Sequence, residues 1–174
     1  MTREQRPRPE RPRPDARHAF QRGSVRGGVA ARTGLRYVGV DLSCPQVEEN
    51  RKQAARMQAI ATKAGARWVA PKWVCADARE LPSLTERIGN DKVDFLFSCP
   101  PYFDLERYSD DPHDLSNAHS YSSFLQGYRQ VIQAALRRLE NDRFCCFVVG
   151  EIRDADGFCR NFVGDTIGAQ APRT

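Results

Sequence analysis

The sequence predicts an α/β domain built on a mostly parallel sheet, and three observations lead to this prediction. Apolar stretches of strand length alternate with stretches whose apolar residues recur at helical spacing. The strand-like stretches are apolar on both faces, as in a parallel sheet that helices cover on both sides. The chain has 174 residues, of which 40% are hydrophobic, and this is enough for one core.

The first 22 residues differ from the rest in composition. They contain the stretch "RPRPERPRPDAR" and almost no apolar side chains. Such a segment cannot bury enough surface to offset the entropy of ordering. We therefore expect a disordered, Arg/Pro-rich arm over residues 1–22 and one partial domain over residues 23–174. Basic arms of this kind either bind nucleic acid or are simply solvated.

Targeting signals and cysteine spacing narrow the class of protein. The sequence has no apolar run long enough to span a membrane and no secretory leader pattern. We expect a cytoplasmic protein without a membrane partner. The six cysteines form no CxxC pair and have no histidine at zinc-ligand spacing. Most lie in or beside apolar runs, so we expect neither disulfides nor a metal site.

The first predicted elements can be read in order along the chain. A glycine-containing turn at residues 23–28 leads into a short helix, and the strand over residues 37–40 ends at Asp41. Residues 45–64 have apolar positions at helical spacing and stop at Gly65, which predicts a helix.

The later elements repeat this alternation. A second strand ends near Asp77, and Pro71 within it removes a ladder hydrogen bond, so this strand should be irregular or lie at an edge. The other predicted elements are a helix over 84–88, a strand over 92–97, a long loop up to residue 121, a helix over 122–139, a strand over 143–149 and a last helix near the C-terminus.

Polar residues gather where these strands end. In open parallel sheets, ligands bind beyond the carboxyl ends of the strands. Asp41 could accept both hydroxyls of a ribose, or it could cap the following helix, as Ser43 also could. Asp77 could accept a hydrogen bond from an adenine amino group, or it could cap a helix. Glu151 could reach the same site or form a local ion pair.

The turn Ser98-Cys99-Pro100-Pro101-Tyr102 ends the third predicted strand. Two prolines fix the backbone and remove two N–H donors, so backbone carbonyls are left without local donors. Such a carbonyl can accept the hydrogens of an exocyclic amine, and the aromatic ring can stack on a flipped base. The other interpretation is a rigid strand terminator with Tyr102 packed in the core.

Together, "RGSVRGGVAARTGLRYVGVDLS" and "DFLFSCPPYF" resemble the S-adenosylmethionine-dependent amino-methyltransferases of DNA, which act on adenine N6 or cytosine N4. The resemblance is particularly to phage and prophage DNA methylases, and it implies a role in restriction-modification. The resemblance implies an incomplete Rossmann-like methyltransferase fold, S-adenosylmethionine as cofactor and DNA as partner. It also assigns residues: Gly23, Ser24 and Gly27 to a cofactor loop, Asp41 to the ribose, Asp77 to the adenine, and Ser98, Cys99, Pro100, Pro101 and Tyr102 to the target amine.

Three departures from this family stand in the sequence. Residues 17–22 are basic and polar where the family has its first, central strand and an acidic loop. Cys99 replaces Asp, Asn or Ser before the prolines, and a thiol is a weak acceptor. The chain stops soon after the fourth strand, so the last strands are missing. A covalent, nucleophilic role for Cys99 is not favoured, because the residues near it include no obvious base that could activate the thiol.

The sequence therefore predicts an N-methyltransferase that acts on DNA. Two alternatives stay open: methylation of RNA or of a protein glutamine, whose enzymes share such a turn, and a non-catalytic remnant that binds nucleic acid.

Overall fold

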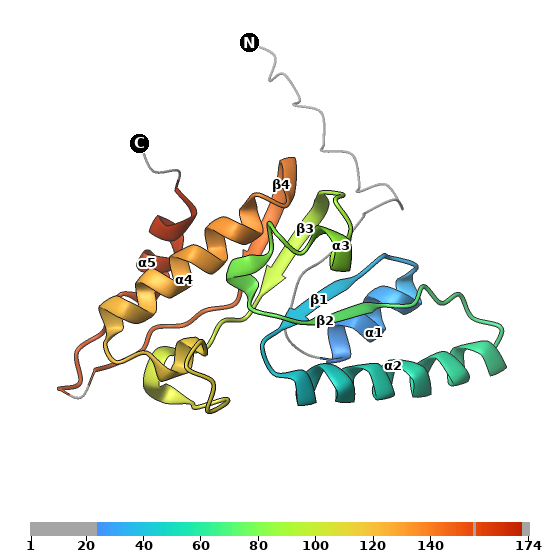
Figure 1. Ribbon diagram of the computed structural model, residues 1–174, viewed down its shortest axis with the longest axis horizontal. Coiled ribbons are helices and arrows are strands. Elements are labelled where there is room, and N and C mark those ends of the chain that lie inside the picture. Colours follow the sequence, from blue (N-terminus) through green and yellow to red (C-terminus); the bar gives the residue numbers. More distant parts are fainter. Residues whose placement is uncertain (1–23, 155, 172–174) are drawn as a thin grey trace, which may run out of the picture.

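A computed structural model describes residues 24–154 and 156–171, so the predicted arm and Gly23 lie outside the described residues. Figure 1 shows the strands with helices packed around them. The elements are α1 (Ser24–Thr33), β1 (Val38–Asp41), α2 (Cys44–Lys63), β2 (Lys72–Cys75), the 3-10 helix η1 (Ala78–Glu80), α3 (Thr85–Ile88), β3 (Val93–Ser98), the 3-10 helices η2 (Phe103–Leu105) and η3 (Leu115–Asn117), α4 (Tyr121–Leu136), β4 (Leu139–Phe147) and α5 (Phe162–Gln170). No helix in this part of the chain is long and apolar enough to cross a membrane.

The strands form two parallel pairs rather than one continuous sheet. β1 pairs with β2, with Asp41 opposite Cys75, and β3 pairs with β4, with Ser98 opposite Phe147. Within the described residues no strand lies between β1 and β3. The predicted α/β class, with a parallel and incomplete sheet, is confirmed.

Local capping fixes where the long helices begin. The Ser43 hydroxyl accepts the Gln46 N–H at 3.3 Å, and Pro45 lies in the first turn of α2, where its missing N–H costs nothing. α4 begins with a capping box between Ser120 and Ser123. Both predicted helices are confirmed, with boundaries shifted by one to three residues.

The two strand pairs share one apolar core. Val40 and Val74 from the first pair pack with Leu96 from the second, and Leu81 and Ala135 close the cluster. A second cluster, rich in aromatic rings, holds α5 against α4. A third cluster places α1 and α2 on the opposite face of β1 and β2.

Among the described residues, part of one face of the β3–β4 pair is exposed, where the prediction expects helices to cover both faces. Phe95 lies opposite Phe144 in the ladder, and these two side chains are 38% and 79% exposed. Leu96 and Phe147 turn to the other face, where the core lies. In the described part of the chain, apolar residues on both faces of this strand pair are therefore not covered completely on both faces.

Three further predictions are wrong in detail. Residues 24–28 are helical rather than a turn, because they form the first part of α1. β4 begins at Leu139, four residues before the predicted start, across an irregular register with β3. Cys44 and Cys75 form a disulfide with their Cα atoms 5.0 Å apart, because the pairing of β1 with β2 brings their ends together.

Candidate functional site

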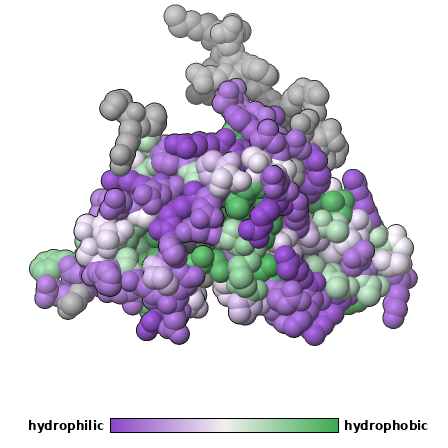
Figure 2. Space-filling view, in the orientation of Figure 1, coloured by the Kyte–Doolittle hydropathy of each residue, from purple (hydrophilic) through white to green (hydrophobic). Residues whose placement is uncertain are grey.

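A pocket opens at the carboxyl ends of β1, β2 and β3. The residues that line it come from both strand pairs, from α4 and from the loop after β3. They are Val40, Asp41, Leu42, Asp77, Ala78, Leu81, Leu96, Ser98, Cys99, Pro100, Pro101, His113, Asp114, Leu115, Tyr128, Val131, Ala135 and Phe147. In the view of Figure 2, apolar surface lies near the centre of the molecule and is surrounded mostly by polar surface. Six of the sequence-predicted site residues therefore meet in one hollow.

Asp41 is a buried acid that lines the pocket, with 4% of its surface exposed. It ends β1, and its Oδ1 accepts the Ser43 N–H at 2.9 Å. Ser43, not Asp41, caps α2 with its side chain. The carboxylate thus holds the turn after β1 and faces the pocket at the same time, a position suited to a hydroxyl donor.

Asp77 lines the same pocket, but its carboxylate is already engaged. Its Oδ1 accepts the Arg79 backbone N–H at 2.8 Å and caps η1. The Arg79 guanidinium also binds both carboxylate oxygens, at 3.0 and 2.8 Å from Nε and at 2.6 Å from Nη2. The capping alternative is therefore present, together with an ion pair that the sequence did not reveal.

The Pro-Pro turn is anchored by the sheet. The Ser98 carbonyl accepts the Val148 N–H at 2.8 Å, so it is occupied by the ladder. The next carbonyls, those of Cys99 and Pro100, each precede a proline that has no N–H to offer. Pro100 is buried, and Cys99 and Pro101 are half-buried on the pocket wall.

Tyr102 lies beside the pocket rather than in its lining. Its ring packs edge-on against Phe162 at 5.5 Å between centroids, and its hydroxyl donates to the Val148 carbonyl at 3.5 Å. Partial burial, with a smaller contribution from the nearby Cys99, raises the pKa of the Tyr102 phenol. Packing against α5 is thus a role that the ring has without any ligand.

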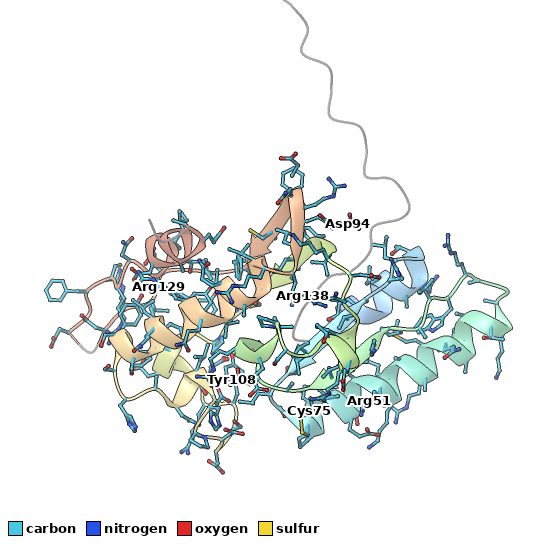
Figure 3. The ribbon with its side chains drawn as sticks, turned by 45° about the horizontal axis from the view of Figure 1, so that its top comes forward. Arg51, Cys75, Asp94, Tyr108, Arg129 and Arg138 are labelled. Atoms are coloured by element: carbon cyan, nitrogen blue, oxygen red, sulfur yellow. A yellow bond between two sulfur atoms is a disulfide. The ribbon has the colours of Figure 1, made fainter. Side chains whose placement is uncertain are left out.

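Residues 108–117, here called the Asp114 loop, belong to the long loop that the sequence predicts, and they contribute His113, Asp114 and Leu115 to the pocket lining. Asp114 is 7% exposed; its Oδ1 accepts the Ser116 N–H and hydroxyl at 3.0 and 2.8 Å, and its Oδ2 accepts the Ser109 hydroxyl at 2.7 Å. The Asn117 amide donates to the Ser109 and Asp111 carbonyls. The repeated Asp and Ser residues are a signal for such local bonds. Tyr108, at the start of this loop, is labelled in Figure 3.

The glycine region does not reach the pocket in the described residues. Gly27 is buried within α1, where a Cβ atom would lie 2.5 Å from the Trp73 ring, so glycine permits close helix packing. Ser24 begins α1. Glu151 accepts the Phe162 and Val163 N–H groups at 3.0 and 3.3 Å and so holds the start of α5, in place of the expected ion pair or cofactor contact.

Comparison with known proteins gives a likeness of fold. No protein-family profile matches the sequence, and no curated protein matches it. Among solved structures, a TehB-like SAM-dependent methyltransferase from Corynebacterium glutamicum aligns with a TM-score of 0.51 and 14% identity over 91% of this chain and 66% of that chain. A protein from Mycobacterium paratuberculosis aligns with a TM-score of 0.40 and 17% identity, over 72% of this chain and 43% of that one. NAD+-bound xylitol dehydrogenase aligns with a TM-score of 0.36 and 17% identity, over 70% of this chain and 47% of that chain.

This chain spans about two thirds of the length of the Corynebacterium protein. At this level of identity the likeness concerns the fold, and it agrees with the parallel strand pairs and their flanking helices. The chain therefore has an incomplete α/β fold that resembles the Rossmann-like fold of this methyltransferase.

Proposed function

We propose that this chain carries the cofactor and target sites of an S-adenosylmethionine-dependent methyltransferase that acts on an exocyclic amine of adenine or cytosine in DNA. One observation carries the proposal: a single pocket is lined by Asp41, by Asp77 and by the turn Ser98–Pro101. These residues come from three strand ends that are far apart in the sequence. The fold likeness to a SAM-dependent methyltransferase supports the choice of cofactor.

The β1–β2 side of the pocket has the chemistry for a nucleoside. Asp41 offers a buried carboxylate at a strand end, where ribose hydroxyls can donate to it. Leu42, Ala78 and Leu81 offer apolar contact for a flat base. Asp77 lies on the same side, but the backbone and guanidinium of Arg79 already occupy both of its carboxylate oxygens, so an adenine amino group would compete with Arg79 for this acceptor.

The β3 side of the pocket has the chemistry for an amine. The Cys99 and Pro100 carbonyls follow the strand end and precede prolines, so one of them can accept an amine hydrogen and orient the nitrogen lone pair. S-adenosylmethionine, when bound, supplies a methyl group on a sulfonium. Because the amine is the nucleophile, the residues of this turn need only hold and orient it, and the Cys99 thiol has no covalent role in this scheme.

Isothermal calorimetry with S-adenosylmethionine tests the cofactor site. We expect micromolar binding to the full chain and at least roughly tenfold weaker binding to Asp41→Asn, since hydrogen bonds to a charged group are worth about 1.5–3 kcal/mol. Asparagine keeps an acceptor for the Ser43 N–H, so the turn should survive. Glu49→Gln, on the exposed side of α2, is the matched control. Equal affinity for the wild type and Asp41→Asn would remove Asp41 from the site.

Methyl incorporation into DNA, RNA and protein tests the substrate class. Transfer to DNA alone supports the proposal, whereas transfer to RNA or to a protein glutamine would select that alternative.

Tyr102→Ala should weaken methyl transfer while it spares cofactor binding, because Tyr102 lies outside the pocket lining. An equal loss of both would show that the ring acts through its packing on Phe162.

A non-catalytic remnant that binds nucleic acid is the second candidate. It is favoured by the separation of the described strands into two pairs, with no ladder between β1 and β3 in the described part. Calorimetry separates the two candidates, since a remnant with a collapsed site would bind DNA but not S-adenosylmethionine.

A further inference from the structure

Arg79 connects two walls of the pocket that belong to different parts of the chain. Its Nε and Nη2 atoms bind the Asp77 carboxylate at the end of β2. The same Nη2 donates to the His113 carbonyl in the Asp114 loop, at 2.9 Å. The side chains of Arg79 and Asp77 are 26% and 18% exposed, so the ion pair is largely shielded from water. One guanidinium therefore spans from the predicted adenine carboxylate to the loop that follows the Pro-Pro turn.

The Asp114 loop has internal order but few other ties to the β1–β2 side. The side-chain hydrogen bonds of Asp114 and Asn117 all lie within residues 108–117. Leu115 packs against α4 at Gly127, which holds the back of the loop. On the pocket side, the hydrogen bond from Arg79 to the His113 carbonyl connects the loop to Asp77, which follows the end of β2. The loop can thus keep its internal shape while its distance from Asp77 depends on Arg79.

We propose that Arg79 is a positioning residue that fixes the Asp114 loop against the Asp77 side of the pocket, and so sets the width of the site for its ligand. The part of this inference that concerns the ligand rests on the proposed function. Arginine suits the task because its planar fork can bind a carboxylate with two nitrogens and still donate elsewhere. Lysine at this position keeps the charge but has a single nitrogen for both partners.

Hydrogen exchange on the ligand-free full chain tests the positional role directly. We expect Arg79→Lys to speed exchange of the amides of residues 108–117 by about tenfold, because a hydrogen bond to a charged group is lost. Exchange in β1 and β2 and the melting temperature should stay near the wild-type values. Arg87→Lys is the matched control, since Arg87 donates to the Cys75 carbonyl at 2.7 Å from α3 and does not touch the loop. Unchanged loop exchange in Arg79→Lys would overturn the proposal.

Binding then separates positioning from simple stability. We expect Arg79→Lys to weaken binding of S-adenosylmethionine about fivefold to tenfold, with Arg87→Lys unchanged. If Arg79 acts through Asp77, Asp77→Asn should by itself weaken binding of S-adenosylmethionine. Arg79→Lys should then weaken binding less in the Asp77→Asn background than in the wild type. If the losses in binding free energy of the two substitutions simply add, Arg79 does not act through Asp77. If the wild type itself does not bind S-adenosylmethionine, the proposed function fails, while the exchange experiment still decides whether Arg79 holds the loop.

Discussion

Removal of the Cys44–Cys75 disulfide should lower the free energy of unfolding by about 3.7 kcal/mol. The bridge joins residues 31 positions apart, from the start of α2 to the end of β2. In the chain-entropy treatment the unfolded chain gains the freedom of that loop, and a loop of this length gives the stated value at 25 °C. Figure 3 shows Cys75 beside the first turn of α2.

The assay is urea denaturation of the oxidised protein, the protein with a reducing agent, and the double variant Cys44→Ala with Cys75→Ala. A slope of about 2 kcal/mol per molar urea converts the loss into a midpoint about 2 M lower. A loss of this size is a large part of the 5–15 kcal/mol that typically separates folded from unfolded states, so the reduced protein should be markedly less stable. Cys159→Ala, which removes an exposed free thiol, is the control and should leave the midpoint unchanged.

Equal midpoints for the oxidised and reduced proteins would refute the loop-entropy reasoning. Mass spectrometry after alkylation under non-reducing conditions checks the bond itself. If all six cysteines react with the alkylating agent, the bond is not formed in solution.

Three other predictions concern a buried ring of the core, a glycine packed against a tryptophan ring, and the dependence of stability on pH. Phe124→Ala should lower stability by about 3–5 kcal/mol by chemical denaturation, because the ring is fully buried among other aromatic rings. Gly39→Ala should cost about 1–3 kcal/mol in the same assay, because a Cβ atom would overlap the Trp73 ring. The hydrogen bond from the His113 backbone N–H lowers the pKa of Asp111 from its usual value, so Asp111 stabilises the fold above the pKa of the unfolded chain, and this contribution is lost as the pH falls through the lowered pKa. Asp111→Asn should therefore melt below the wild type at pH 7 and converge with it in strong acid, and a constant difference would contradict this.

The sequence predicted the positions that depend on chain-local patterns. Asp41 and Ser98 could be placed at strand ends because each closes an apolar run, and their shared pocket follows from the rule for parallel sheets. Helix α2 was predictable because helical spacing and a capping serine agree.

Features that arise from tertiary packing could not be predicted in this way. The disulfide depends on the register that sets Asp41 opposite Cys75, and cysteine spacing contains no information on register. The resemblance assigns Gly27 to a cofactor loop, whereas in the structure Gly27 lies within α1 and leaves room for the Trp73 ring. The bond from Arg79 to His113 joins residues 34 positions apart, and no pattern in the sequence indicates it.

The contact between the two strand pairs has a thermal consequence. Val40 and Val74 meet Leu96 through side chains alone, while each pair is held internally by backbone hydrogen bonds. Apolar contact weakens on cooling, whereas backbone ladders do not depend on it in the same way. Cooling should therefore weaken the apolar contact between the two strand pairs before it weakens the pairing within each of them. A ligand that contacts both strand pairs would then stabilise their association more strongly as the temperature falls.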